Sequence, residues 1–389
     1  MKKIAVLTVT LLFLIHGAIG LERSIFANEI LTSVGAFVLA IVLINRKLKA
    51  NKYATIILIM VAYGSLSFLI GHYSNTDATL YEKLRTTPIV YSSFCFFTGY
   101  YIVHTGVTRR YYEKLIPILM LPTLVLGAII GGKLSPPSIA ALTINRTTDN
   151  RRIFYFFTIS FIVVIEAAHQ LLLGNSDGSS TIAIMLVFCV MMFKLKDKVF
   201  HATRRINIVA VLVILLLIAA GLKITAYVHN DFFTQGFSYF GDSYDANSIW
   251  RLMFWAKIIN DMSAVNWLLG IGLANPLFNE LDPTTFFIIA SEPDAIDRPY
   301  TLGLHNSILT YLVRLGSIGL FLFLYITIKT LKSLTLHNDM KSEALFVSFS
   351  LILIPAFFNV VLESPLYAGQ FWLILGICAR HQKQAKEAP

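Results

Sequence analysis

Apolar runs of membrane-spanning length recur along almost the whole chain, and they constrain the fold more than any other feature. A helix needs about 20 such residues to cross the hydrocarbon core of a bilayer. The composition agrees, since 56% of the residues are hydrophobic, 14% are charged and the mean hydropathy is +0.69. We therefore predict an all-α polytopic membrane protein. The runs lie at 4–20, 30–45, 54–73, 89–107, 115–132, 153–173, 181–193, 208–227, 306–328, 344–362 and 366–379.

The connections between the runs predict the orientation of the chain, because Lys and Arg collect on the cytoplasmic side of a membrane protein. Five connections are rich in these residues: Arg46–Lys52, Thr108–Lys114, Lys194–Arg205, Lys329–Glu343 and Arg380–Lys386. All five share one side only if the chain crosses once more between 133 and 153, and the short segment Ser135–Ile144 is the candidate. This predicts about 12 transmembrane helices with both termini in the cytoplasm. Nine cations then remain outside: Arg23, Lys83, Arg85, Lys133, Lys223, Arg251, Lys257, Arg298 and Arg314.

The domain organisation predicted from this layout is simple. Residues 1–389 form a single integral membrane domain, in which the first run is a retained helix, and residues 228–304 form one large outward-facing loop between transmembrane helices. No P-loop or dinucleotide fingerprint is present, which argues against ATP-driven work. The cysteines Cys95, Cys189 and Cys378 lie within apolar runs, so we interpret them as packing residues. The net charge of +10 does not imply a nucleic-acid partner, because in a membrane protein Lys and Arg residues collect on the cytoplasmic side.

The outward loop holds the stretch Ser248–Met262, which has the periodicity of a helix. At 100° per residue, Arg251 lies among Trp255, Ile258 and Met262. A guanidinium on an apolar face is costly to desolvate unless an anion meets it there. We therefore predict a site for a phosphorylated lipid. The alternative is that Arg251 snorkels, or that it pairs with an aspartate of the same loop.

Other polar residues near the outer boundary are candidates for the same site. His305 lies where the loop re-enters the membrane, and a neutral imidazole there can accept a proton near neutral pH. Asn306 follows it and either caps the next helix or orients substrate. Arg314 lies deeper, where a cation is a functional hypothesis by default, with a structural pairing as the alternative. Lys223 either adds to an anion site or snorkels, and Arg298 either contacts substrate or is a solvated loop residue.

These residues occur in a recognisable order. Arg251 and Trp255 are followed by Gly270-Ile271-Gly272, then by His305-Asn306 opening a helix that contains Gly316 and Gly319. This pattern over residues 248–320, with the large loop before the third-last helix, resembles the O-antigen ligase/polymerase superfamily, that is, the Wzy-type polymerases and WaaL-type ligases. The resemblance implies a metal-independent glycosyltransferase of the GT-C type, without a cofactor, in the bacterial inner membrane. Its substrate would be an undecaprenyl-pyrophosphate-linked oligosaccharide at the periplasmic face.

The resemblance also assigns expected roles. Arg251 matches the family's arginine and is expected to stabilise the pyrophosphate leaving group, while His305 matches the family's histidine and is expected to be the base. Substrate-binding roles are expected for Asn306, Arg314, Lys223, Arg298 and Trp255. Implied partners are membrane lipid, a chain-length regulator and a flippase of the same pathway. Nothing in the sequence indicates a nucleic-acid partner or a metal site.

One departure from the family pattern affects the choice of reaction. Many relatives, ligases above all, carry an arginine where an outward-facing turn begins the next inward helix, and the corresponding stretch here, Gly174–Thr181, has serine in its place. A second cation for the pyrophosphate must then come from elsewhere. We therefore favour a polymerase, which transfers the growing glycan onto another lipid-linked repeat unit. The alternative is a ligase that transfers it onto lipid A–core, and a lesser alternative is a transporter or flippase.

Overall fold

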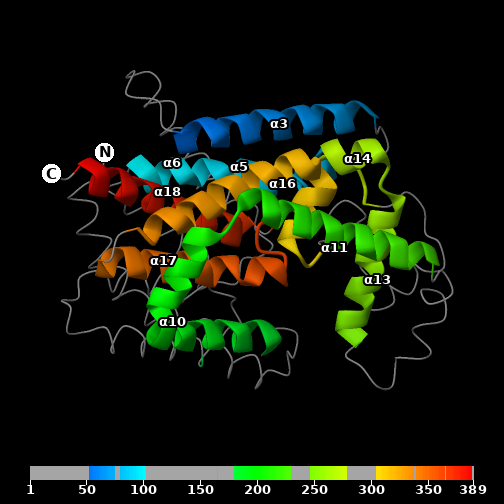
Figure 1. Ribbon diagram of the computed structural model, residues 1–389. Coiled ribbons are helices and arrows are strands. Elements are labelled where there is room, and N and C mark those ends of the chain that lie inside the picture. The colour runs from blue at the N-terminus through cyan, green and yellow to red at the C-terminus, as the bar shows by residue number, and fades with distance from the viewer. Residues whose placement is uncertain are drawn as a thin grey trace.

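A computed structural model describes residues 52–74, 79–101, 164, 179–228, 246–277, 304–336, 339–363 and 365–387 of the chain. All regular secondary structure in these residues is helical (Figure 1). The elements are α3 (Lys52–Ser74), α4 (Leu80–Leu84), α5 (Pro88–Tyr91), η1 (Ser92–Phe94), α6 (Cys95–Tyr101), α10 (Ser179–Arg205), α11 (Ile208–Val228), α13 (Ala246–Asp261), α14 (Ala264–Leu269), α16 (Ser307–Leu334), α17 (Met340–Leu353), η6 (Pro355–Phe357) and α18 (Pro365–Glu387).

Several helices have the length and composition of membrane spans. In the part of the chain that the structure describes, α3 and α16 each qualify alone. The helices α10 and α11 qualify together as a pair bent by 84°. The bend and a kink at Leu195 set the basic second half of α10 apart from the two apolar segments on either side. Apolar helices thus make this a membrane protein, as the hydropathy predicted.

Two of the expected runs are not single helices. In the described part, the run 89–107 is divided into the three consecutive short helices α5, η1 and α6. The first of them, α5, begins at Pro88. The run 344–362 is helical only as far as Leu353, because Pro355 has no N–H to continue the α-helix and starts the short helix η6. The runs 4–20, 30–45 and 115–132, the segment 135–144, and all of 153–173 except Val164 lie outside the described residues.

The core is built where α16, α17 and α18 pack against α6. It is rich in buried aromatic side chains, among them Tyr311, Phe323, Phe371 and Trp372. The backbones of α6 and α18 approach closely, since a Cβ on Gly99 would overlap the carbonyl of Leu373 and one on Gly376 would overlap the carbonyl of Phe96. The three cysteines, Cys95, Cys189 and Cys378, are free and buried, which confirms that they are packing residues.

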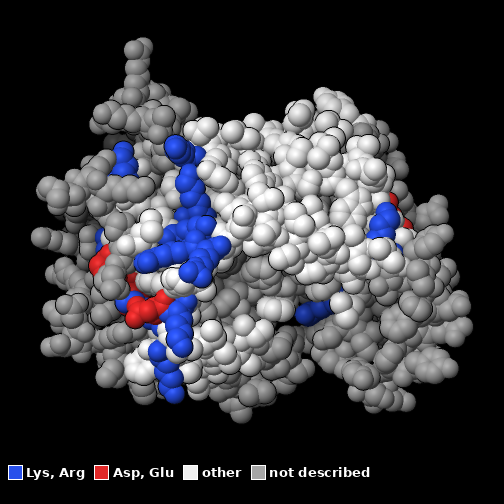
Figure 2. Space-filling model, in the orientation of Figure 1, with Lys and Arg blue, Asp and Glu red and all other residues white. Residues whose placement is uncertain are grey.

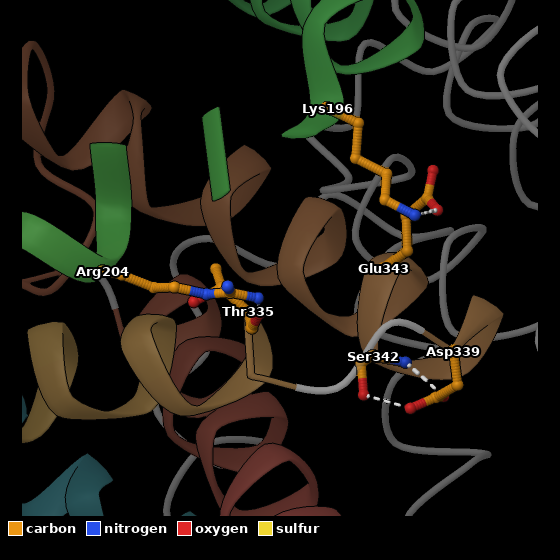
Figure 3. A network of polar contacts seen from close by, with 6 residues as sticks. All are labelled: Lys196, Arg204, Thr335, Asp339, Ser342 and Glu343. Atoms are coloured by element: carbon orange, nitrogen blue, oxygen red, sulfur yellow. Dashed lines mark hydrogen bonds and ion pairs between the residues drawn. The ribbon is translucent and has the colours of Figure 1, made fainter. Parts of the chain in front are cut away.

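Lys and Arg side chains gather in a band toward one end of the described surface, beside a broad surface without charge (Figure 2). Polar contacts anchor the basic half of α10 at this end to the neighbouring helices (Figure 3). Lys196 forms an ion pair of 3.0 Å with the buried Glu343 of α17, and Arg204 donates to the carbonyl of Thr335 at the end of α16. Asp339 caps α17 by accepting from the backbone N–H of Ser342 at 2.9 Å.

Candidate functional site

The helix α13 has the two faces that its sequence predicted. Phe254, Ile258 and Met262 are buried, and they pack in one cluster with Leu304 and Val313 from the start of α16. On another side of the helix, Lys257 pairs with Asp261 at 3.6 Å. The apolar face therefore fixes α13 against the first turns of α16.

Arg251 lies one turn before this cluster and is partly buried. Its guanidinium donates to the backbone carbonyl of Phe358, which follows η6, at 3.4 Å. Trp255, one turn further along α13, donates from its indole N–H to the carbonyl of Leu304. These two side chains therefore connect α13 to two other segments, the residue before His305 and the turn that follows α17.

His305 occupies an unusual backbone conformation at the start of α16. Its φ of 50° lies in the left-handed region, which non-glycine residues adopt only when the surrounding structure holds them there. Asn306 then caps the helix, because its side-chain oxygen accepts from the backbone N–H groups of Ile308 at 3.1 Å and Leu309 at 3.0 Å. The structure thus gives Asn306 the capping role that was one of its two sequence interpretations.

The two glycine motifs fit into one another. The helix α16 is interrupted at Gly316, whose φ of 64° and ψ of −170° are not helical. The interruption leaves carbonyls of the preceding turn without their usual helical partners. The loop after α14 supplies substitutes: Ile271 N–H donates to the Val313 carbonyl at 2.8 Å and Gly272 N–H donates to the Arg314 carbonyl at 3.2 Å. Tyr63 of α3 donates its hydroxyl to the Leu315 carbonyl at 3.1 Å.

The deep cation Arg314 belongs to the same arrangement. It is 4% exposed, and its guanidinium donates to the carbonyl of Asn275 and, at 3.4 Å, to that of Gly272. The loop is also held from α3 and the segment before α5, since Leu273 N–H donates to the Ser67 hydroxyl and Ala274 N–H to the Thr86 hydroxyl. The Arg314 guanidinium is therefore paired with backbone carbonyls of this loop.

The remaining predicted cations are placed as follows. Lys223, near the end of α11, donates from its ammonium to the Met262 carbonyl at the end of α13, at 2.7 Å. It therefore ties α11 to the end of α13. Arg298 lies outside the described residues, as do Asp242 and Asp245, the aspartates considered as partners of Arg251. Substrate contacts of all these residues remain predictions.

One polar side chain beside the site was not predicted. Glu363, in the turn before α18, accepts hydrogen bonds from the hydroxyls of Ser307 and Thr310 in the first turn of α16. Burial raises the pKa of its carboxyl, and the two hydroxyl donors oppose that shift. The available signal was an acidic residue between two strongly apolar runs, a position at which a charge has to be explained.

The candidate site consists of amino-acid side chains within the residues that the structure describes. These residues contain no group of three or more His, Cys, Asp or Glu side chains that could hold a metal ion. Near the start of the interrupted helix α16 they place the Trp255 indole and the partly buried Glu363 carboxyl, with His305 just before the helix and the Arg251 guanidinium at the carbonyl of Phe358. This set can bind an anion and move a proton.

A polytopic helical membrane protein with such a site can be compared with known families. A family described as O-antigen ligase matches residues 162–324, a segment that includes Arg251, Trp255, both glycine motifs and His305. Over these residues the chain carries the domain of that family, which confirms the relationship to the O-antigen ligase/polymerase superfamily. No curated protein matches the chain. The family match indicates a glycan-transfer enzyme that acts on a lipid-linked glycan.

Proposed function

We propose that the protein is a polysaccharide polymerase of O-antigen, capsule or exopolysaccharide biosynthesis. It transfers a growing undecaprenyl-pyrophosphate-linked glycan onto another lipid-linked repeat unit at the periplasmic face of the bacterial inner membrane. The observation that supports the proposal is the position of Trp255 and Arg251 near the start of α16. Trp255 donates to the Leu304 carbonyl beside His305, and Arg251 contacts Phe358, whose neighbour Asn359 accepts from Ser307 at 3.2 Å. The match to the O-antigen ligase family over this segment supports it.

The proposed step is a nucleophilic displacement. A hydroxyl of the acceptor sugar attacks the anomeric carbon of the donor glycan, a new glycosidic C–O bond forms, and the C–O bond to the lipid pyrophosphate breaks. The imidazole of His305 takes the hydroxyl proton and later releases it to water. The pyrophosphate leaves with the bonding electrons, and the guanidinium of Arg251 stabilises the charge that develops on it. Neither group requires a metal ion for its part.

The proposed orientation rests on the distribution of charge. Lys and Arg gather in a band toward one end of the molecule in Figure 2. The basic half of α10 carries exposed residues of this kind, among them Lys194, Lys198 and Arg205. We assign this end to the cytoplasm, because positive residues are retained there. In this orientation the segment 228–304 is the periplasmic loop, and both termini are cytoplasmic. About 12 spans complete this proposed topology.

A transporter is disfavoured by the way the interrupted helix is used. Broken helices of transporters expose backbone groups to the substrate or a coupling ion. Here the carbonyls of Val313, Arg314 and Leu315 accept hydrogen bonds from the loop after α14 and from Tyr63. The interruption of α16 is thus filled by protein, which supports a structural purpose for it.

The test is the surface-polysaccharide banding pattern of a deletion strain complemented with wild type, Arg251→Ala or His305→Asn, with membrane levels of each protein measured. We expect both variants to lose the ladder and to retain one repeat unit attached to core. Lys257→Ala is the matched control, because this cation lies on the other side of the same helix in an exposed pair with Asp261. Loss of every attached unit, with long lipid-linked chains accumulating, would establish the ligase instead. Normal ladders in both variants would refute the site.

A further inference from the structure

Both carboxylate oxygens of Glu363 accept hydrogen bonds from hydroxyl groups of α16. Ser307 donates to Oε2 and Thr310 donates to Oε1. Ser307 is already an acceptor, since the backbone N–H groups of Val361 and Leu362 both donate to its hydroxyl at 3.0 Å. Its single hydroxyl proton is therefore directed away from them, toward Glu363 Oε2 or the carbonyl of Asn359 at 3.2 Å. When it is ionised, the carboxylate accepts these hydrogen bonds and donates none, and the hydroxyl donors oppose the effect of burial on its pKa.

Glu363 differs from three other described carboxylates that hold structure together. Glu343 pairs with Lys196, Asp261 pairs with Lys257, and Asp339 lies 3.8 Å from His381. Within the described part of the chain, Glu363 has hydroxyl partners and no Lys or Arg ion pair. A buried charge of this kind is costly if its only purpose is stability. Its position makes a functional purpose the better explanation.

The first turn of α16, which Glu363 contacts, directly follows His305 and the capping residue Asn306. Glu363 accepts a hydrogen bond from the hydroxyl of Ser307. Ser307 follows His305 by two positions, so the Cα atoms of His305 and Ser307 are at most about 8 Å apart. Thr310, its other partner, also contacts the carbonyl of the capping residue Asn306 at 3.1 Å. The first turn of α16 and the left-handed residue before it are therefore fixed to Glu363 from two points.

We propose that Glu363 is a positioning residue for His305: its carboxylate holds the first turn of α16 through Ser307 and Thr310, and its charge stabilises the protonated imidazole during glycan transfer. This inference rests on the proposed function. When His305 takes the proton of the acceptor hydroxyl, it becomes a cation near Arg251, which is unfavourable. The carboxylate offsets that repulsion. The other titratable groups that face this region are Arg251, through the Phe358 carbonyl, and Tyr311 on α16.

The test uses the purified full-length protein in liposomes, with lipid-linked repeat units extracted from the deletion strain as substrate. We expect Glu363→Gln to lower kcat about tenfold or more with KM nearly unchanged. We also expect the acidic midpoint of the kcat–pH profile to move down by about one pH unit. The direction follows from charge: the carboxylate favours protonated imidazole, so its removal lets His305 remain a neutral base at lower pH. Glu363→Asp should restore much of the midpoint, since it restores the charge.

Glu343→Gln is the matched control, because it also neutralises a buried carboxylate but does so beside Lys196. It should leave the pH midpoint in place, whatever it does to stability. If Glu363→Gln does not reach the membrane, Thr310→Val takes its place, since it removes one donor to the carboxylate and keeps the side-chain shape. A wild-type kcat and midpoint in Glu363→Gln, or a wild-type kcat in Thr310→Val where that variant replaces it, would overturn this inference while His305→Asn stays inactive. No transfer by the wild type itself would refute the proposed function instead.

Discussion

Gly270 and Gly316 lie against each other's backbone, and both have positive φ, at 82° and 64°. A Cβ on Gly316 would overlap the backbone N of Gly270 and the carbonyl of Leu268. A Cβ on Gly270 would overlap the carbonyl of Arg314. Each glycine therefore permits the close approach that lets the loop after α14 satisfy the interrupted helix α16.

Gly316→Ala should strongly destabilise the protein. The combination of φ 64° and ψ −170° is adopted almost only by glycine and costs an alanine about 1–3 kcal/mol, and the overlap with Leu268 adds to it, so we expect a loss of at least about 2 kcal/mol. Thermal unfolding of the purified protein in detergent would measure this loss. Gly221→Ala on α11 is the control, because a Cβ there meets nothing within 4 Å and alanine favours a helix. Equal melting temperatures for the two variants would show that the close approach does not matter.

The sequence predicted the parts of this arrangement but not their contacts. Apolar runs and helical periodicity anticipated α3, α11, α16 and the buried face of α13, because these features are local. The meeting of the Gly270–Gly272 loop with Gly316 is tertiary, and periodicity carries no information about it. The same holds for Glu363, whose hydroxyl partners lie 53 and 56 residues away. Local signals also identified His305 as a candidate without indicating its left-handed backbone.

Substitutions of His305 should separate its backbone from its imidazole. Glycine adopts a φ of 50° freely and asparagine tolerates it, whereas alanine does not. We therefore expect His305→Gly to melt higher than His305→Ala, by a difference worth about 1 kcal/mol, with His305→Asn between them. All three should be inactive in glycan transfer if the imidazole is the base. Activity retained in His305→Gly would show that only the backbone conformation matters.

Arg314 should be required for the loop after α14 rather than for substrate. Its guanidinium reaches the carbonyls of Gly272 and Asn275, and a lysine cannot span both in the same planar geometry. We expect Arg314→Lys to cost about 1–2 kcal/mol and Arg314→Met about 3 kcal/mol. Limited proteolysis would report the loop directly, as faster cleavage near residues 270–277. Unchanged cleavage together with a raised KM for the lipid-linked glycan would favour the substrate-binding role instead.

Acid should weaken the cap of α17. The nearby His381, whose Nε2 lies 3.8 Å from the carboxyl, is the largest cause that holds the pKa of Asp339 well below its ordinary value, and the hydrogen bonds from Ser342 add to it. A lowered carboxyl pKa contributes stability above the unfolded value of about 3.9, and this stability is lost as the pH falls below that value. Asp339→Asn should therefore melt below wild type near pH 7, by about 1 kcal/mol, and the difference should narrow between pH 4 and pH 2. A difference that stays constant over this range would mean that the charge of Asp339 contributes nothing.

Trp255 should support activity more than stability. Its indole N–H donates to the carbonyl of Leu304, and the next residue is His305, so this bond helps to set where the imidazole points. Trp255→Phe keeps most of the apolar packing and removes the donor, which should cost about 1 kcal/mol of stability. Because small displacements of a catalytic group reduce rates disproportionately, we expect kcat for glycan transfer to fall about tenfold or more. Trp267→Phe is the matched control, since Trp267 packs against the same cluster from α14. If both variants lose kcat equally, the bond to Leu304 has no special part in placing His305, and the loss reflects the packing of the cluster as a whole.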